Sequence, residues 1–385
     1  MKALRLCFIG PADNVTTRRW VEWFASRGHE VTLLTVEPAE TALLHGFRQI
    51  DLTMSWGGRK VGRLASAVRM AATLRRLKPD VVHVHYTRGL AWGLLLNRFH
   101  PYVVMPWGSD VLEEQGAFRE WYSRRLTCAV LGRADLLAIP SEYLDRRVRA
   151  LLPAPPPIAR IAPGVNLRLF RCGLDVRPLR ERWGIAESRR VIFSPRLAQP
   201  FYQHDRIIRA LPAVRDQVPE AVLVVAEQFA DRDYVADLRR LAAALGVADQ
   251  VRFVGAIPYP EMPLWYNLAD AVVMVPRSDG LPNSLLEAMA CGAVPILNAL
   301  PQYAEVIEHG ENGYLVDLER GDLADTLVRV LRDPGLRQRI GQANMAKATR
   351  VADQDSEMSR MEDWYFRLAG PDRHKADAGE RWGVV

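Results

Sequence analysis

Two carboxylates eight positions apart stand out in the stretch RSDGLPNSLLEAMACGAVPI, residues 277–296. Asp279 lies in a turn that contains a glycine and a proline, at the end of a predicted strand over 270–277. Glu287 lies one turn inside a short, otherwise apolar helix. An acid in such a helix is costly to bury unless hydroxyl groups or a cation bind it.

The start of this helix could bind a second kind of group. Asn283 or Ser284 is the predicted N-terminal cap, and the helix is expected to run to about Cys291, before Gly292. Amides at a helix start carry partial positive charge and suit a phosphate. A ligand with both a phosphate and vicinal hydroxyls would satisfy the amides and Glu287 together, and a nucleotide sugar is such a ligand.

The composition is that of a globular protein with two domains. The chain has 385 residues, of which 49% are apolar and 25% charged. Its four cysteines are far apart and form no CxxC pair, so neither a disulfide framework nor a zinc site is indicated, and a cytoplasmic setting fits best. The start does not resemble a signal peptide, and no apolar run approaches the roughly 20 residues that span a bilayer. We expect a soluble or peripheral protein.

Positive charge is concentrated in the first part of the chain. Residues 1–170 hold 24 Lys and Arg against 14 Asp and Glu, whereas residues 171–385 hold 27 against 31. The densest run, residues 59–80, has seven cations before its first acid, Asp80. It is interpreted either as a solvated helix face or as a surface for anionic lipid. A nucleic-acid site is disfavoured because no binding motif or interleaved aromatic residue is present.

Short β-branched runs alternate with helical patterns along the whole chain, which predicts an α/β fold with two consecutive parallel-sheet domains. The boundary is expected near 165–185, where strand patterning lapses after a proline-rich piece. Ligands of such sheets bind beyond the carboxyl ends of the strands. The predicted strands are LRLCFIG, HEVTLLTV, DVVHVHY, YVVMPWG, DLLAIPS, RVIFSPR, AVLVVAE, VRFVGAI, DAVVMVP, AVPILNA and NGYLVDL.

Several ligand classes are excluded by missing motifs. The first strand ends FIGPADN rather than GxGxxG, and no GxxxxGK[ST] loop occurs, which argues against dinucleotide and P-loop sites. There is no HExxH either. His83 and His85 alternate along one strand and share a face, so a metal pair there is one possible interpretation. The preferred interpretation is a histidine at the strand end that faces the ligand cleft.

Taken in order, several segments resemble the retaining glycosyltransferases of family 4, which have the GT-B fold. The resemblance implies two Rossmann-like domains around a cleft, over residues 1–170 and 171–354. A helix over 355–369 would pack back on the first domain, and 370–385 would form a flexible tail. The segments are SDGLPNSLLEAMACGAVPI, TTRRWVEWFASRGHEVTLLT, PDVVHVHY, MPWGSDVL, APGVNLRLF, VRFVGAIPYPEMPLWYNLADAVVMVPRSDG and VIEHGENGYLVD.

The family pattern assigns roles to residues of the second domain. Glu287 would accept hydrogen bonds from the ribose hydroxyls of the donor, while Asp279 would face the transferred sugar. Arg196 would neutralise the departing diphosphate. The remaining donor-binding positions are the turn and helix-start residues Gly280, Asn283 and Ser284, and the main chain from Gly255 to Ile257, which would border the base.

In the first domain, Gly10 matches a loop that approaches the diphosphate. The expected acceptor contacts are Arg18, Arg19, Trp20, Trp107 and Asp110. No cofactor or metal is implied beyond the donor, a UDP- or GDP-sugar. The favoured acceptor is a polyprenyl-diphosphate-linked or surface-polysaccharide saccharide at the inner membrane face. The mechanism implied is attack from the face that the nucleotide leaves, with the proton passing to the leaving phosphate.

Three positions depart from the family pattern. Asp279 stands where glutamate is usual, and Trp107 stands where a histidine is usual. The lysine that normally follows the arginine is missing from QPFYQHD, which supplies Tyr202 and His204 instead. Two alternatives therefore stay open, a nucleotide-sugar 2-epimerase and a noncatalytic nucleotide-sugar-binding subunit.

Overall fold

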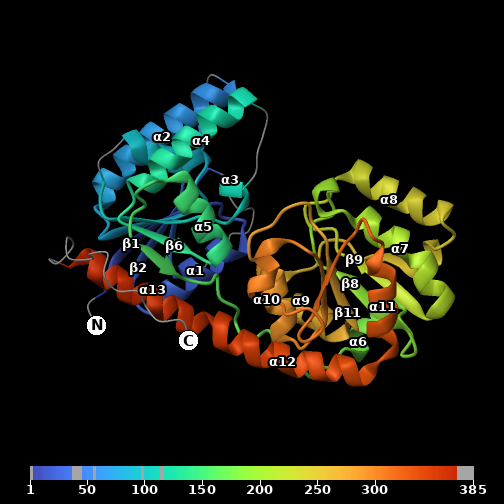
Figure 1. Cartoon of the computed structure of the whole chain (residues 1–385). Helices are drawn as coiled ribbons and strands as arrows, with labels where there is room; N and C mark the ends of the chain where they lie inside the picture. The colour runs from blue at the N-terminus through green and yellow to red at the C-terminus, as the bar shows by residue number, and fades with distance from the viewer. Residues whose placement is uncertain (1–2, 37–45, 55–57, 97–98, 113–116, 371–385) are drawn as a thin grey trace. The chain divides into compact units, whose positions relative to one another are not determined.

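The computed structural model describes residues 3–36, 46–54, 58–96, 99–112 and 117–370. Of the predicted tail, all but Gly370 lies outside these described residues. The chain divides into two compact units (Figure 1). Residues up to 163 and from 356 onward form unit 1, and residues 164–355 form unit 2.

Unit 1 contains a parallel sheet of seven strands in the order β3-β2-β1-β4-β5-β6-β7. Its strands are β1 Arg5–Ile9, β2 Glu30–Thr35, β3 Arg48–Asp51, β4 Val81–His85, β5 Tyr102–Met105, β6 Leu136–Ile139 and β7 Ile158–Arg160. Its helices are α1 Val15–Ser26, α2 Gly58–Leu77, the 3-10 helix η1 Gly89–Leu96, α3 Ser109–Leu112, α4 Ala117–Gly132 and α5 Glu142–Leu151.

The sheet of unit 1 is covered on both faces, which explains why its strands are apolar at successive positions. In β1, Leu6 and Phe8 join one core cluster, which contains residues of α1 and of the last helix. Cys7 and Ile9 join the cluster on the other face, which contains residues of α2, α4 and α5. The period of two therefore distributes one strand between two cores.

Unit 2 repeats this plan with a parallel sheet of six strands in the order β10-β9-β8-β11-β12-β13. Its strands are β8 Arg190–Ser194, β9 Ala221–Val225, β10 Val251–Phe253, β11 Ala271–Met274, β12 Pro295–Asn298 and β13 Tyr314–Val316. Its α-helices are α6 Arg177–Trp183, α7 His204–Gln217, α8 Arg232–Ala244, α9 Met262–Leu268, α10 Asn283–Ala290, α11 Asp322–Arg332 and α12 Pro334–Ala352. Short 3-10 helices are η2 Pro200–Tyr202, η3 Ala248–Gln250, η4 Tyr259–Glu261 and η5 Pro301–Glu305.

Each of the eleven strands predicted from sequence is present, and the α/β class is confirmed. The prediction missed β3 and β7. Both lie at an edge of the sheet of unit 1, and apart from Ala159 of β7 their residues are exposed or half-buried, so they lack the apolar run that marks a central strand. Among the described residues, every helix is too short or too polar to cross a bilayer.

The last helix, α13 Gln354–Ala369, packs on unit 1 from Ser356 onward. Met358, Met361 and Tyr365 are fully buried in the cluster that contains α1. At its amino end, the Glu357 carboxylate accepts a hydrogen bond from the Ala162 amide, at 2.7 Å. One face of α13 is thus an integral part of the core of unit 1.

Glu362 of α13 is 4% exposed and makes a buried polar contact with the segment after α1. Its carboxylate accepts hydrogen bonds from Arg27 at 3.0 Å and contacts the imidazole of His29 at 2.8 Å. Burial raises the pKa of Glu362, but its hydrogen bonds and charge interactions with Arg27 and His29 outweigh this, so the net shift is downward.

We expect Glu362→Gln to lower the free energy of unfolding by about 1–3 kcal/mol, because Arg27 and His29 lose a charged acceptor. A carboxylate with a lowered pKa stabilises the fold above its unfolded pKa, and this contribution is lost as pH falls through the folded value. The difference between variant and wild type should therefore shrink in acid. Urea unfolding followed by circular dichroism at several pH values measures it.

Asp363→Asn is the matched control, since Asp363 is the neighbouring acid on the exposed side of α13. Its unfolding free energy should stay within about 0.5 kcal/mol of wild type. Equal destabilisation by both variants would show that Glu362 acts only through the net charge of the helix.

Candidate functional site

The two acids singled out in the sequence lie in adjoining segments of the fold: Asp279 in the turn between β11 and α10, and Glu287 in α10. The helix α10 starts at Asn283 and ends at Ala290, and Gly292 follows it with φ +75°. Pro282 occupies the N-cap position with extended backbone. The prediction of Asn283 or Ser284 as the cap was therefore wrong, and Pro282 makes no side-chain capping hydrogen bond. The physical reason is the fixed φ of proline, which sets the entry to the helix one residue earlier.

Asp279 is held by groups from two other segments and by the next residue of its own turn. Its carboxylate pairs with the guanidinium of Arg196 at 3.0 Å and accepts a hydrogen bond from the Tyr303 hydroxyl at 2.8 Å. The Gly280 amide donates to it at 2.9 Å, and the Gln302 side chain donates to the Asp279 carbonyl at 2.6 Å. These contacts orient the carboxylate at the carboxyl end of the sheet.

Arg196 follows β8 and connects Asp279 to the helix start. Its guanidinium donates to the Ser284 hydroxyl at 3.0 Å and lies over the ring of Tyr202, 4.7 Å from the ring centre. Burial lowers the pKa of Arg196, but the charge of Asp279 and the neighbouring tyrosines raise the pKa by more, so the net shift is upward. The arginine therefore stays charged although its side chain is only 13% exposed. Tyr202, from the segment that lacks the expected lysine, thus stacks on this cation.

Glu287 is 4% exposed and contacts two phenol groups. The Tyr259 hydroxyl donates to one carboxylate oxygen at 2.9 Å, and the Tyr266 hydroxyl donates to the other at 3.3 Å. Burial raises the pKa of Tyr266 and the charge of Glu287 raises it again, so this phenol keeps its proton and remains a donor. The sequence predicts hydroxyl groups or a cation around this acid, and two of its hydroxyl partners are tyrosines of the protein.

The segment over 255–259 brings the predicted base-binding positions to the same region, because Tyr259 contacts Glu287. Gly255 has φ +71°, a conformation that favours glycine. Its amide donates to the Glu227 carboxylate at 2.8 Å, and the Ile257 carbonyl accepts from the Gln228 side chain at 2.5 Å. Glu227 and Gln228 follow β9 and were missed from sequence.

The predicted residues of unit 1 gather at the carboxyl ends of β1, β4 and β5. Gly10 follows β1, where a Cβ would lie 3.0 Å from the Cβ of His85 and 3.2 Å from the Thr17 hydroxyl oxygen, so the loop needs a glycine. Trp107 lies next to His85, with ring centres 5.8 Å apart. His83 and His85 are buried, and burial lowers the pKa of His85 to about 3.

Asp110 is 2% exposed and orders the two loops after β4 and β5. Its carboxylate accepts hydrogen bonds from the amide and hydroxyl of Thr87 and from the amides of Trp107 and Gly108, at 2.7–3.0 Å. Burial raises the pKa of Asp110, and these hydrogen bonds lower it, with a net upward shift. Its contacts are those of a residue that positions loops.

The three residues of α1 lie in different surroundings. Arg18 is half-buried and donates to the Ala12 carbonyl at 2.9 Å. Arg19 and Trp20 both donate to the Pro163 carbonyl at 3.3 Å, and Trp20 has no exposed surface. Trp20 packs in the core, where an acceptor cannot touch it, and we do not carry it into the proposed site.

Tertiary packing supplies the functional residues that sequence reasoning missed. Tyr259, Tyr266, Gln302 and Tyr303 belong to η4, α9 and η5, and their sequence signal is only that of aromatic and polar residues in short helices. Within the described residues, no group of three or more histidine, cysteine or acidic side chains could hold a metal ion.

Comparisons with known proteins give the family. The protein family described as "Glycosyl transferases group 1" matches residues 175–347, and the family described as "Glycosyl transferase 4-like" matches residues 5–141. A D-inositol 3-phosphate glycosyltransferase from Kribbella flavida is 30% identical over 362 residues, which cover 89% of this chain and 84% of that protein.

A second relative matches over a shorter stretch. It is a GDP-mannose-dependent alpha-(1-6)-phosphatidylinositol monomannoside mannosyltransferase from Mycolicibacterium smegmatis, 31% identical over 210 residues. That match covers 52% of this chain and spans about half of the relative, 54% of its length.

Among solved structures, Anabaena Alr3699/HepE in complex with UDP-glucose has the same fold. The TM-score is 0.81 at 18% sequence identity, and the match covers 95% of this chain and 100% of that one. At this identity the likeness shows the fold alone, two Rossmann-like domains of the GT-B type. By the two family matches and the Kribbella flavida relative, the chain belongs to the group 1 glycosyl transferases, glycosyltransferase family 4.

Proposed function

We propose that this protein transfers a sugar from a nucleoside-diphosphate sugar to a hydroxyl acceptor, with retention of configuration. The observation that carries the proposal is the cluster at the start of α10. There, Arg196 contacts both Asp279 and Ser284, and the buried carboxylate of Glu287 lies one helical turn further on. Cation, helix amides and carboxylate are the three groups that a sugar nucleotide requires.

The diphosphate would bind at the first turn of α10. The amides of Asn283 and Ser284 are at the helix start, where partial positive charge stabilises an anion. Arg196 would add a full positive charge. Its stabilising interaction with the diphosphate would become stronger as the leaving group accumulates negative charge. Because Tyr202 stacks on its guanidinium, the arginine is held in place without a second cation. This assignment needs no metal ion.

Glu287 would accept hydrogen bonds from the ribose hydroxyls. Tyr259 and Tyr266 contact different oxygens of its carboxylate and so fix its plane. Asp279 would position the transferred sugar, which must lie closer than it would to a glutamate because the side chain is one methylene shorter. Its contact with Tyr303 limits rotation of the carboxylate.

In the chemical step, the acceptor oxygen bonds to the anomeric carbon as the bond from that carbon to the diphosphate oxygen breaks. Attack occurs on the face that the nucleotide leaves, through a transition state with oxocarbenium character. The acceptor proton passes to the leaving phosphate oxygen. No side chain is required as a general base, and the role of the protein is to align the reactants and stabilise charge.

The donor is proposed to be a UDP- or GDP-sugar and the acceptor a lipid-linked saccharide. The name of the mycobacterial relative gives it GDP-mannose and a phosphatidylinositol mannoside, and the Anabaena structure holds UDP-glucose. The cationic first half of the chain supports peripheral binding to the inner face of the cytoplasmic membrane.

We expect Glu287→Gln to weaken donor binding about 10- to 100-fold, since a charged acceptor of ribose hydrogen bonds is lost. Isothermal titration with UDP- and GDP-sugars measures affinity, and nucleotide release measures turnover. Glu311→Gln, an exposed acid of the same unit, is the control and should bind donor normally. A fully active Glu287 variant would contradict the assignment. Conversion of one donor sugar into another would instead indicate an epimerase.

Arg196→Lys should lower kcat/KM about 100-fold, because an ammonium group cannot contact Asp279, Ser284 and the diphosphate in the same planar geometry. Steady-state assays of nucleotide release measure the loss. Arg277→Lys changes an exposed arginine near the same turn and should leave kcat/KM unchanged. Wild-type kinetics in the Arg196 variant would remove the diphosphate role.

Sedimentation with vesicles tests the membrane proposal. Binding should rise with the fraction of phosphatidylglycerol and fall as salt is added, because exposed charges are screened. Arg69→Gln, on the exposed side of α2, should weaken binding. Equal binding to neutral and anionic vesicles would rule out electrostatic attachment.

A further inference from the structure

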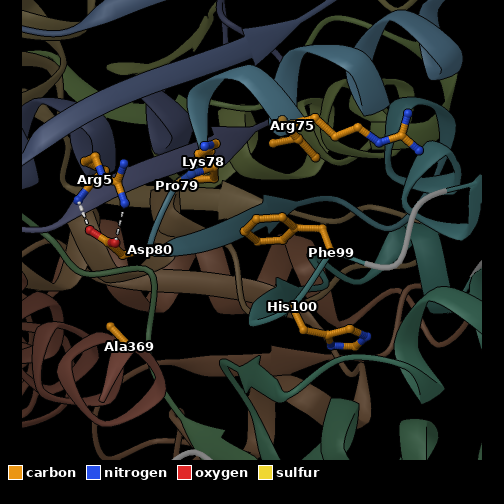
Figure 2. A pocket seen from close by; sticks show the side chains of 9 residues that line it. Arg5, Arg75, Lys78, Pro79, Asp80, Phe99, His100 and Ala369 are labelled. Atoms are coloured by element: carbon orange, nitrogen blue, oxygen red, sulfur yellow. Dashed lines mark hydrogen bonds and ion pairs between the residues drawn. The ribbon is translucent and has the colours of Figure 1, made fainter. Parts of the chain in front are cut away.

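A cavity lies at the amino ends of the strands of the unit 1 sheet, whereas Gly10 and Trp107 follow the carboxyl ends. Figure 2 shows it between the end of α2 and the starts of β1, β4 and β5. Its volume is about 320 Å³, within the range of small-molecule sites. Its lining residues are Arg5, Leu74, Arg75, Lys78, Pro79, Asp80, Phe99, His100 and Ala369.

The charges around the cavity do not balance. The Asp80 carboxylate accepts hydrogen bonds from the Arg5 amide at 2.8 Å and from its guanidinium at 2.9 Å, so this acid is paired (Figure 2). Arg75 and Lys78 are exposed, and neither side chain forms an ion pair within the described part of the chain. His100 contacts Asp135 at 2.8 Å, which fixes the ring beside the cavity. The unpaired charge is positive.

Lys78 also has an unusual backbone conformation. It follows the last residue of α2 with φ +46°, in the left-handed region where glycine is the common residue. Its amide closes the helix by donating to the Leu74 carbonyl at 3.0 Å. Glycine would make the same backbone contact without strain. A non-glycine residue in such a conformation points to use of its side chain.

We propose that this cavity binds the phosphate group of a small molecule. Lys78 and Arg75 provide the positive charge, His100 provides a ring nitrogen at the wall, and Phe99 and Leu74 provide apolar surface for the rest of the ligand. The site is separate from sugar transfer, since none of its residues belongs to the proposed donor or acceptor positions. The phosphate can come from a soluble compound or from a lipid headgroup.

Two variants and a neighbouring control test the site in the full-length chain. Lys78→Gly removes the ammonium group while relieving the left-handed conformation, so the thermal midpoint should stay level or rise. Arg75→Gln removes the second cation at an exposed helix position that tolerates glutamine. Arg76→Gln, the adjacent exposed arginine that does not line the cavity, is the control.

The readout is the NMR signal of the His100 ring in protein labelled at histidine, identified by its loss in a His100→Asn sample. This signal reports on the cavity and not on phosphate bound at α10. Inorganic phosphate should shift it saturably, and the apparent affinity should fall about fivefold or more in Lys78→Gly and Arg75→Gln but less than about twofold in Arg76→Gln.

A second probe separates the two sources of phosphate. A His100 shift with inorganic phosphate supports a soluble ligand, whereas a shift only with bicelles that contain phosphatidic acid supports a lipid headgroup. No saturable shift with either probe would overturn the proposal. Equal weakening by Arg75→Gln and Arg76→Gln would also overturn it, because the effect would then reflect general surface charge.

Discussion

Two carboxylates of unit 2, one buried and one half-buried, impose the constraint on which its site depends. Asp279 and Glu287 lie where water is largely excluded, and a buried charge is stable only with partners. Asp279 obtains them from Arg196 and Tyr303, and Glu287 from Tyr259 and Tyr266. Because these partners come from the loop after β8 and from η4, α9 and η5, the need to satisfy two acids ties these four segments to one helix start.

The same contacts hold one cation, Arg196, beside the start of α10. Arg196 remains charged because the negative charge of Asp279 opposes the effect of burial on its pKa. The ring of Tyr202 stacks against the guanidinium. The aromatic ring restricts the arginine without neutralising it. In the proposed function, this one well-held cation beside the start of α10 would serve the diphosphate where the family pattern supplies another lysine.

In unit 1, polar contacts order the loops at the carboxyl ends of its strands. Asp110 collects four hydrogen bonds from the loops after β4 and β5, and Gly10 allows the loop after β1 to approach His85 closely. The helix α13 completes the core beneath, where Tyr365 forms a hydrogen bond with His83. Core and loops are thus connected through the strand that carries both histidines.

The sequence by itself determined the features that depend on local pattern. Alternating β-branched runs predicted eleven strands and the α/β class, and the spacing of Asp279 and Glu287 marked the turn and helix at the site. Edge strands such as β3 were missed because they have little apolar surface to bury. The start of α10 was misplaced by one residue because Pro282 takes the cap position.

Only the tertiary structure decided which groups satisfy those acids. Tyr259, Tyr266 and Tyr303 are ordinary aromatic residues in the sequence, and the direction of their phenol groups depends on how η4, α9 and η5 pack. Trp20 likewise matched a functional pattern but lies wholly in the core. Local periodicity fixes which face of an element is buried, whereas the partner of a polar atom depends on contacts between residues far apart in the chain.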